Sequence, residues 1–226
     1  IAPEIDILRP FFNDPGFVGA NREQSIASID SLDGGAADTH VGYFTLSIPN
    51  TMLYASARTG AGYAEQHEDV RATIDADLRA HYGHELPSSL AYCSRSGSPM
   101  VPWLEPDVND HLEELAAAGV HKVVLAPIGF ISDHMEVAYD LDTEAMETAT
   151  ELGMQAARAG TASTHPLFIS GLVDMVLERA ARERGEDVEP VTVGALPAFA
   201  DVAPAGSCRM RDGEITGIPV IAGMED

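Results

Sequence analysis

Short apolar segments alternate with amphipathic helical segments at regular intervals along this chain. Four segments rich in apolar and β-branched or aromatic side chains predict strands, the last of them weakly: 40–49, 89–93, 120–130 and 154–160. Helical spacing of apolar residues predicts helices over five further segments: 16–32, 62–83, 110–119, the stretch beyond 130 up to about 153, and 166–185. This order favours an α/β fold in which helices cover both faces of a parallel sheet.

The helix expected after residue 130 contains a row of carboxylates. Glu136, Asp140 and Glu144 form its first part, and Glu147 and Glu151 continue it. Like charges four residues apart destabilise a helix by about 0.2–0.5 kcal/mol per pair, so the row is unfavourable for the helix itself. Steps of four also drift by about 40° around an α-helix, and a straight acidic line would therefore require local unwinding, as in a π-bulge.

Two interpretations of this acidic row are open. In the structural one, Asp133 at the N-cap and Glu136 three residues later form a capping box, and the other acids lie on a solvated face. In the functional one, the row lies where ligands of such sheets bind, beyond the carboxyl end of a strand, and its oxygens form a cation path. His134 is expected on a different side of the helix from Glu136 and in a structural role.

The charge balance excludes some classes of partner. With 13 basic and 36 acidic residues the net charge is −23, which repels nucleic acid and anionic lipid and attracts cations. No apolar run reaches the roughly 20 residues of a membrane span, and no basic leader precedes an apolar stretch, so stable membrane insertion and export are not expected. The two cysteines, Cys93 and Cys208, form no disulfide framework and fit a cytoplasmic location.

Three ordered segments closely resemble the ferrochelatases: FTLSIP at 44–49, SRSGSPMVPWLEPDVNDHL at 94–112 and PIGFISDHMEVAYDLD at 127–142. The likeness extends from residue 8 to residue 166 and has an actinobacterial character. It implies a chelatase-like, doubly wound parallel sheet, with two Rossmann-like half-domains and a porphyrin cleft between them. By this resemblance the chain divides into the end of the first half with a connecting helix (1–39), the second half-domain (40–162), a C-terminal helix (163–185) and a flexible tail (186–226).

The resemblance also implies an activity, the insertion of Fe²⁺ into a porphyrin in haem biosynthesis. In actinobacterial members the porphyrin is usually coproporphyrin III and the product coprohaem. Porphyrin and ferrous iron are then the partners, together with transient partners in the haem pathway. Glu136 would be the catalytic base or metal ligand, and Asp140 and Glu144 would continue the line along which iron arrives. Four residues would contact the porphyrin: Ser47, Pro49, Pro102 and Trp103.

The sequence departs from the family pattern in three places. Family members have a catalytic histidine in a Thr-Ala-His-Ser-Ile-Pro motif, whereas this chain reads Thr45, Leu46, Ser47, Ile48, Pro49, one residue shorter and without the histidine. The family's N-terminal portion is expected to precede Ile1. No 2Fe–2S cluster is expected, because the tail offers Cys208 alone where many actinobacterial members have three cysteines.

These departures leave alternatives open. The leading hypothesis is a ferrochelatase, truncated or impaired because the catalytic histidine is absent. The second is a non-catalytic protein that binds porphyrin or divalent cations on a chelatase scaffold, and the third is an incomplete sequence with no independent function.

Overall fold

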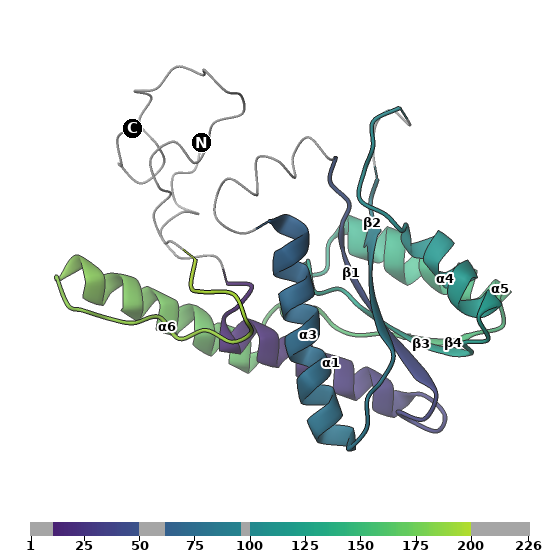
Figure 1. Cartoon of the computed structure of the whole chain (residues 1–226), viewed down its shortest axis with the longest axis horizontal. Helices are drawn as coiled ribbons and strands as arrows, with labels where there is room; N and C mark the ends of the chain where they lie inside the picture. The colour runs from purple at the N-terminus through teal and green to yellow at the C-terminus, as the bar shows by residue number, and fades with distance from the viewer. Residues whose placement is uncertain (1–10, 50–61, 96–99, 200–226) are drawn as a thin grey trace.

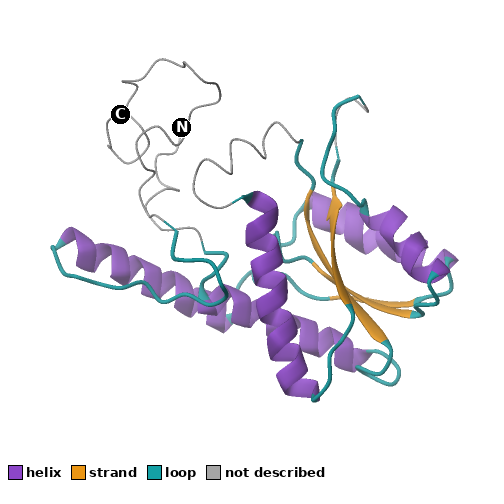
Figure 2. Ribbon diagram, in the orientation of Figure 1, coloured by secondary structure: helices purple, strands orange, loops and turns teal. Residues whose placement is uncertain are grey.

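The computed structural model describes residues 11–49, 62–95 and 100–199. Helices and strands alternate in the predicted order (Figures 1 and 2). They are α1 (Pro15–Ser31), β1 (Thr39–Leu46), α3 (Tyr63–Tyr82), β2 (Ser88–Cys93), α4 (Val108–Ala117), β3 (Lys122–Ala126), the π-helix η2 (Val137–Ala145), α5 (Met146–Glu151), β4 (Gln155–Arg158) and α6 (Pro166–Glu183). β1, β3 and β4 are shorter than the apolar runs that predicted them, because those runs continue into the loops at the strand ends, whereas β2 begins one residue earlier than predicted.

The four strands form one parallel sheet in the order β2-β1-β3-β4. β1 lies in the middle: Tyr43 pairs with Leu90 of β2 on one side and with Ala126 of β3 on the other. The chain first winds from β1 outward to β2 and then crosses back over β1 to β3. The predicted doubly wound α/β fold is therefore confirmed, and the winding changes direction between β1 and β3.

Side chains that alternate along the strands pack into two separate cores. Val41 and Tyr43 of β1 belong to the core under α1 and α3. Phe44 of β1 and Leu125 of β3 belong to the core under α4, η2 and α5. The side chains of both cores are buried. Because both faces of the sheet are covered, the strands have continuous apolar sequences rather than alternating ones. In Figure 2 the sheet lies between these two helical layers.

Local sequence signals set the helix ends. Asp14 caps α1 by accepting hydrogen bonds from the backbone N–H groups of Gly16 (2.8 Å) and Phe17 (3.3 Å), and Pro15 occupies the first helical position. Helix α3 ends at Gly83, whose φ of 78° is the left-handed conformation that favours glycine. Both helices agree with the predicted ranges 16–32 and 62–83 to within one residue at each end.

Helix α6 packs along α1, and the buried ring of Phe168 contacts the ring of Phe17 of α1, with centroids 5.7 Å apart. Beyond it, residues 186–199 contain no helix or strand. This segment is attached to the body by hydrogen bonds from Val193 N to Asn13 O (2.9 Å) and from Ala195 N to the Asp69 carboxylate (2.7 Å). Among the described residues no helix is long and apolar enough to cross a membrane. The division of the chain at 39, 162 and 185 stays a prediction.

Two buried histidines predict acid sensitivity of the fold. Burial lowers the pKa of His67 to about 4, and burial together with His111 lowers that of His40 to about 4. The unfolded chain takes up these protons near pH 6.5, so stability is lost as the pH falls from about 6.5 towards 4. For His67, which is fully buried, we expect a loss of about 2 kcal/mol between pH 7.5 and 5. Urea unfolding at both pH values measures the free energy of unfolding and tests this loss. His67→Gln should remove about 2 kcal/mol of the difference between the two pH values. His81→Gln, at an exposed position, should leave the difference unchanged.

Candidate functional site

The carboxyl ends of β1 and β3 form the place where a sheet of this order binds ligands. Because the winding changes direction between these two strands, the loops that follow them diverge and leave room at the sheet edge. Those loops begin at Leu46 and at Ala126. The first loop leads to Ser47 and Pro49, which were predicted to contact the porphyrin. The second loop leads to Glu136, which was predicted to bind the metal. Both loops start at this edge of the sheet.

Three of the four predicted porphyrin contacts lie together there. Pro49 and Trp103 form an antiparallel bridge, although 54 positions separate them in the chain. The backbone N–H of Leu104 donates to Ile48 O (3.1 Å), and Ser47 Oγ donates to Leu104 O (2.9 Å). The two segments therefore form one wall, which we call the Trp103 wall: Ser47, Ile48, Pro49, Trp103 and Leu104.

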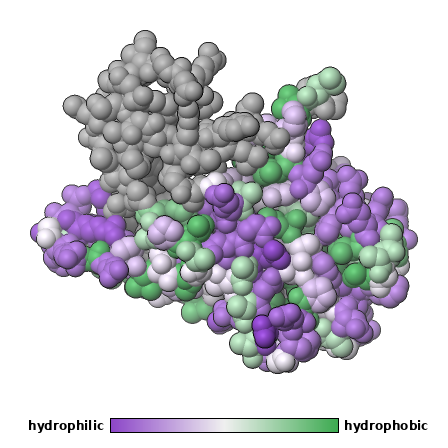
Figure 3. All heavy atoms as spheres, in the orientation of Figure 1, coloured by the Kyte–Doolittle hydropathy of each residue, from purple (hydrophilic) through white to green (hydrophobic). Residues whose placement is uncertain are grey.

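Exposure differs among the predicted porphyrin contacts. Pro102 is exposed beside the Trp103 wall, Trp103 is half-buried and Ser47 is buried. The indole Nε1 of Trp103 is shielded from solvent and has no hydrogen-bond partner within the described residues. The loop that contains these residues also exposes Met100. Figure 3 shows that apolar and polar residues are interspersed over this face of the molecule.

The acidic row lies on a helix that is unwound as the sequence required. Residues 137–145 form the π-helix η2, with Glu136 at its N-cap. The buried residues Val137, Leu141 and Ala145 also step by four and anchor η2 on the sheet. The acidic row is the neighbouring row, so it follows the edge of this buried contact. Asp140 and Glu144 are accordingly half-buried, whereas Glu147 and Glu151 are exposed.

The row is connected to the end of β2. Ser94 directly follows β2 in the left-handed conformation (φ 62°), and its hydroxyl donates a short hydrogen bond to the Asp140 carboxylate. Ser94 also begins the loop that leads to Trp103. The half-buried part of the acidic row and the Trp103 wall are therefore attached to the same strand end, an arrangement that the sequence spacing did not reveal.

The capping-box interpretation of Asp133 is wrong. Its carboxylate accepts hydrogen bonds from Arg158 Nη1 (3.0 Å) and Thr161 Oγ1 (3.2 Å), and Arg158 also binds Asp142 through Nε (2.6 Å). Arg158 at the end of β4 thus attracts the carboxylate that was expected to cap the helix. These bonds hold the loop that leads into η2 against the sheet edge.

His134 also differs from its prediction. The helix begins at Met135, so His134 lies before it and its ring is free to turn towards Glu136. The His134 Nδ1 to Glu136 Oε2 distance is 2.6 Å. The Glu136 side chain is 52% exposed in spite of this contact, so one oxygen has a fixed neighbour while the carboxylate as a whole is open to solvent.

The carboxylates at this edge of the sheet create a negative electrostatic potential, which is visible in the pKa values of their neighbours. Burial, together with the negative charges of Asp140, Asp107 and Glu136, raises the pKa of the Cys93 thiol to about 12. Burial, Asp110, Asp140 and Glu144 also raise the pKa of Asp107. A cation at this edge would relieve that repulsion. Within the described residues, however, no three His, Cys, Asp or Glu side chains are arranged as a closed metal site.

Leu46 and His67 lie at the end of β1 on opposite faces of the sheet. The half-buried Leu46 side chain packs on the core under η2, and it offers no proton acceptor. On the other face His67 Nε2 is 2.9 Å from Thr45 Oγ1. His67 belongs to α3 and is fully buried, which the helical spacing of that segment did not indicate.

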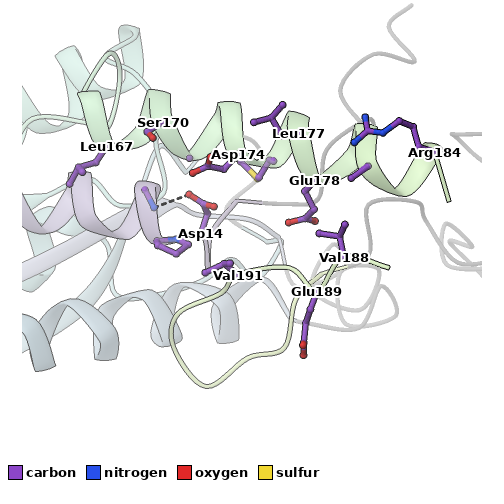
Figure 4. A pocket seen from close by; sticks show the side chains of 15 residues that line it. Asp14, Leu167, Ser170, Asp174, Leu177, Glu178, Arg184, Val188, Glu189 and Val191 are labelled. Atoms are coloured by element: carbon purple, nitrogen blue, oxygen red, sulfur yellow. Dashed lines mark hydrogen bonds between the residues drawn. The ribbon is translucent and has the colours of Figure 1, made fainter. Parts of the chain in front are cut away.

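A separate groove of about 720 Å³ lies between α6, the start of α1 and residues 188–191. Figure 4 shows Leu177, Val188 and Val191 around it, with the carboxylates of Asp174 and Glu178. Its lining includes none of the predicted site residues. The strand-end site described above is therefore distinct from this groove.

The fold is that of an α/β protein with a doubly wound parallel sheet, a class of sheet in which ligands bind at the switch point. The ferrochelatase family model matches residues 1–180. The chain is 46% identical over 215 residues to a coproporphyrin III ferrochelatase of Streptomyces coelicolor, covering 92% of this chain and 57% of that protein. It is 45% identical over 177 residues to one of Frankia alni, covering 78% and 46%. The chain belongs to the ferrochelatase family.

The chain spans about half the length of the curated relatives it matches. Among solved structures, a multi-domain protein of Deinococcus radiodurans described as similar to chelatases shows a distant likeness. It is 16% identical, with a TM-score of 0.46 over 74% of this chain and 30% of that one.

Proposed function

We propose that this chain forms part of a ferrochelatase that inserts Fe²⁺ into coproporphyrin III to give coprohaem in haem biosynthesis, with an activity that is impaired by the missing histidine. The observation that supports this most is the half-buried carboxylate pair, Asp140 and Glu144, on the helix after β3, with Asp140 bonded to Ser94 at the end of β2. Family membership supplies the reaction class. The cytoplasm is the proposed location, and proteins of the haem pathway are the proposed transient partners.

In the proposed reaction the porphyrin lies against the Trp103 wall, with Ser47, Pro49, Pro102 and Trp103 as contacts. Metal insertion requires that two pyrrole nitrogens lose their protons, so the site needs a base close to the ring. Glu136 is the proposed base and first iron ligand, because its carboxylate is open at the start of the row. Asp140 and Glu144 provide hard oxygen ligands along the approach, which suit a ferrous ion that arrives hydrated.

The open arrangement of the row agrees with iron as a substrate. A closed set of ligands would hold the ion tightly, whereas an insertion enzyme must pass it on. The carboxylates of η2 lie along the helix rather than around a point, and Ser94 orients Asp140 by a hydrogen bond. The proposed role of the row is therefore to concentrate and deliver Fe²⁺.

A non-catalytic porphyrin- or cation-binding protein is the second candidate, and Leu46 is the observation that favours it. The apolar Leu46 occupies the motif position at which the family histidine is missing. Such a protein would keep the wall and the row without turnover.

Anaerobic mixing of the full-length protein with Fe²⁺ and coproporphyrin III, followed by the Soret band, tests the proposed function. We expect conversion faster than in buffer, and slower conversion of protoporphyrin IX. Porphyrin binding without conversion would support the binding protein, and the absence of both would contradict the two candidates together.

A further inference from the structure

The end of β1 is fixed by three polar side chains that belong to no proposed ligand set. Thr45 Oγ1 lies 2.6 Å from the Tyr63 hydroxyl and 2.9 Å from His67 Nε2. The Tyr63 hydroxyl also donates to Leu46 O (3.0 Å). Thr45 and His67 are fully buried. Tyr63 and His67 are one turn apart on α3, so this helix reaches the strand end through both.

The directions of these hydrogen bonds follow from counting protons. The His67 Nδ1 atom is 2.7 Å from Tyr63 O, a carbonyl that can only accept, so Nδ1 carries the proton of the neutral ring. His67 Nε2 must then accept, and Thr45 donates to it. The single Tyr63 hydroxyl proton is therefore shared between Thr45 Oγ1 and Leu46 O. The His67 and Thr45 protons thus each have one assigned acceptor, and the Tyr63 hydroxyl links Thr45 to the backbone at Leu46.

Thr45 also sets the position of the loop after β3. Gly129 N donates to Phe44 O (3.0 Å), and a Cβ atom at Gly129 would lie only 1.9 Å from Thr45 Oγ1. The loop that leads to Glu136 therefore rests directly on Thr45. On its other side, Thr45 is followed by Leu46 and Ser47, where the Trp103 wall begins.

We propose that Thr45, Tyr63 and His67 are positioning residues, which fix the spacing between the Trp103 wall and the loop that carries Glu136. The inference rests on the proposed function, since these two parts are the proposed porphyrin and iron sides. The three residues act through Leu46 O and Gly129 and exchange no proton with the substrate. Their loss shifts the porphyrin relative to Glu136 and leaves the approach of iron along Asp140 and Glu144 unchanged.

Thr45→Val and Thr45→Ser in the full-length protein test the inference. Valine keeps the shape and removes the hydroxyl, while serine keeps the hydroxyl. We expect Thr45→Val to lower kcat/KM for porphyrin roughly tenfold or more, because misplacement by about 1 Å can reduce rates by up to two orders of magnitude. The KM for Fe²⁺ should not change, and Thr45→Ser should stay within about twofold of the unchanged protein.

Tyr43→Phe is the matched control, because it removes another buried hydroxyl of β1, which donates to Asp75 (2.9 Å) away from the site. Its porphyrin and iron kinetics should equal those of the unchanged protein even if its thermal midpoint falls. Equal porphyrin kinetics for Thr45→Val and Thr45→Ser would overturn the inference alone. If the unchanged protein binds porphyrin without turnover, quenching of porphyrin fluorescence provides the same comparison between the variants. If the unchanged protein neither binds nor converts porphyrin, both the proposed function and this inference are contradicted.

Discussion

Glu136→Gln should reduce iron insertion by at least about 100-fold in the full-length protein, because a positioned acid–base group contributes typically 10²–10⁴-fold. Glutamine has nearly the same shape but can neither accept a pyrrole proton nor neutralise Fe²⁺. The Glu136 side chain is 52% exposed and lies 2.6 Å from His134, so the fold should be unaffected. The initial rate of the Soret shift, measured with excess coproporphyrin III and Fe²⁺, provides the value.

Glu147→Gln is the matched control for that experiment. It removes one carboxylate from the same row at an exposed position beyond η2, so the change in overall charge is identical. We expect its rate within about twofold of the unchanged protein, as for most substitutions of exposed residues. Unchanged turnover in Glu136→Gln, or equal losses in both variants, would show that Glu136 is not the base.

Replacement of Leu46 by the dipeptide Ala-His should raise the insertion rate by roughly 100-fold, the effect of adding a positioned base. The substitution restores the family motif in which a histidine precedes Ser-Ile-Pro. Leu46 is the last residue of β1, where one extra residue can be accommodated as a bulge. The same Soret assay measures the gain, and circular dichroism verifies that the variant remains folded.

The control for this gain is Ala-Gln in the place of Leu46, which has the same length and no basic ring. It should stay at the rate of the unchanged protein. Equal rates for Ala-His and Ala-Gln, with porphyrin binding retained, would show that the missing histidine is not what limits turnover. That result would support the non-catalytic porphyrin-binding protein.

The fold was predictable because its signals are local. Apolar β-branched runs predicted β1 and β3, and the order of elements predicted the doubly wound sheet. The need for unwinding in the acidic row predicted the π-helix η2, since spacing by four residues is a property of the sequence alone. These features depend on neighbours within a few positions of each other.

The contacts of the site were less predictable because they join distant parts of the chain. Arg158 follows Asp133 by 25 positions, and its pull on that carboxylate removed the expected capping box. The start of the helix at Met135 rather than earlier placed His134 beside Glu136. The burial of His67 depends on the approach of α3 to Thr45, 22 positions away. No periodic pattern contains such information.

The central claim is that the half-buried part of the acidic row delivers iron. The most direct measurement is the Fe²⁺ dependence of insertion in Asp140→Asn/Glu144→Gln compared with Glu147→Gln/Glu151→Gln, two variants that remove the same charge from one row. We expect the first to raise the KM for Fe²⁺ roughly tenfold, with the porphyrin KM unchanged, and the second to leave both constants unchanged. Equal shifts in the two variants, or no shift in the first, would contradict the claim.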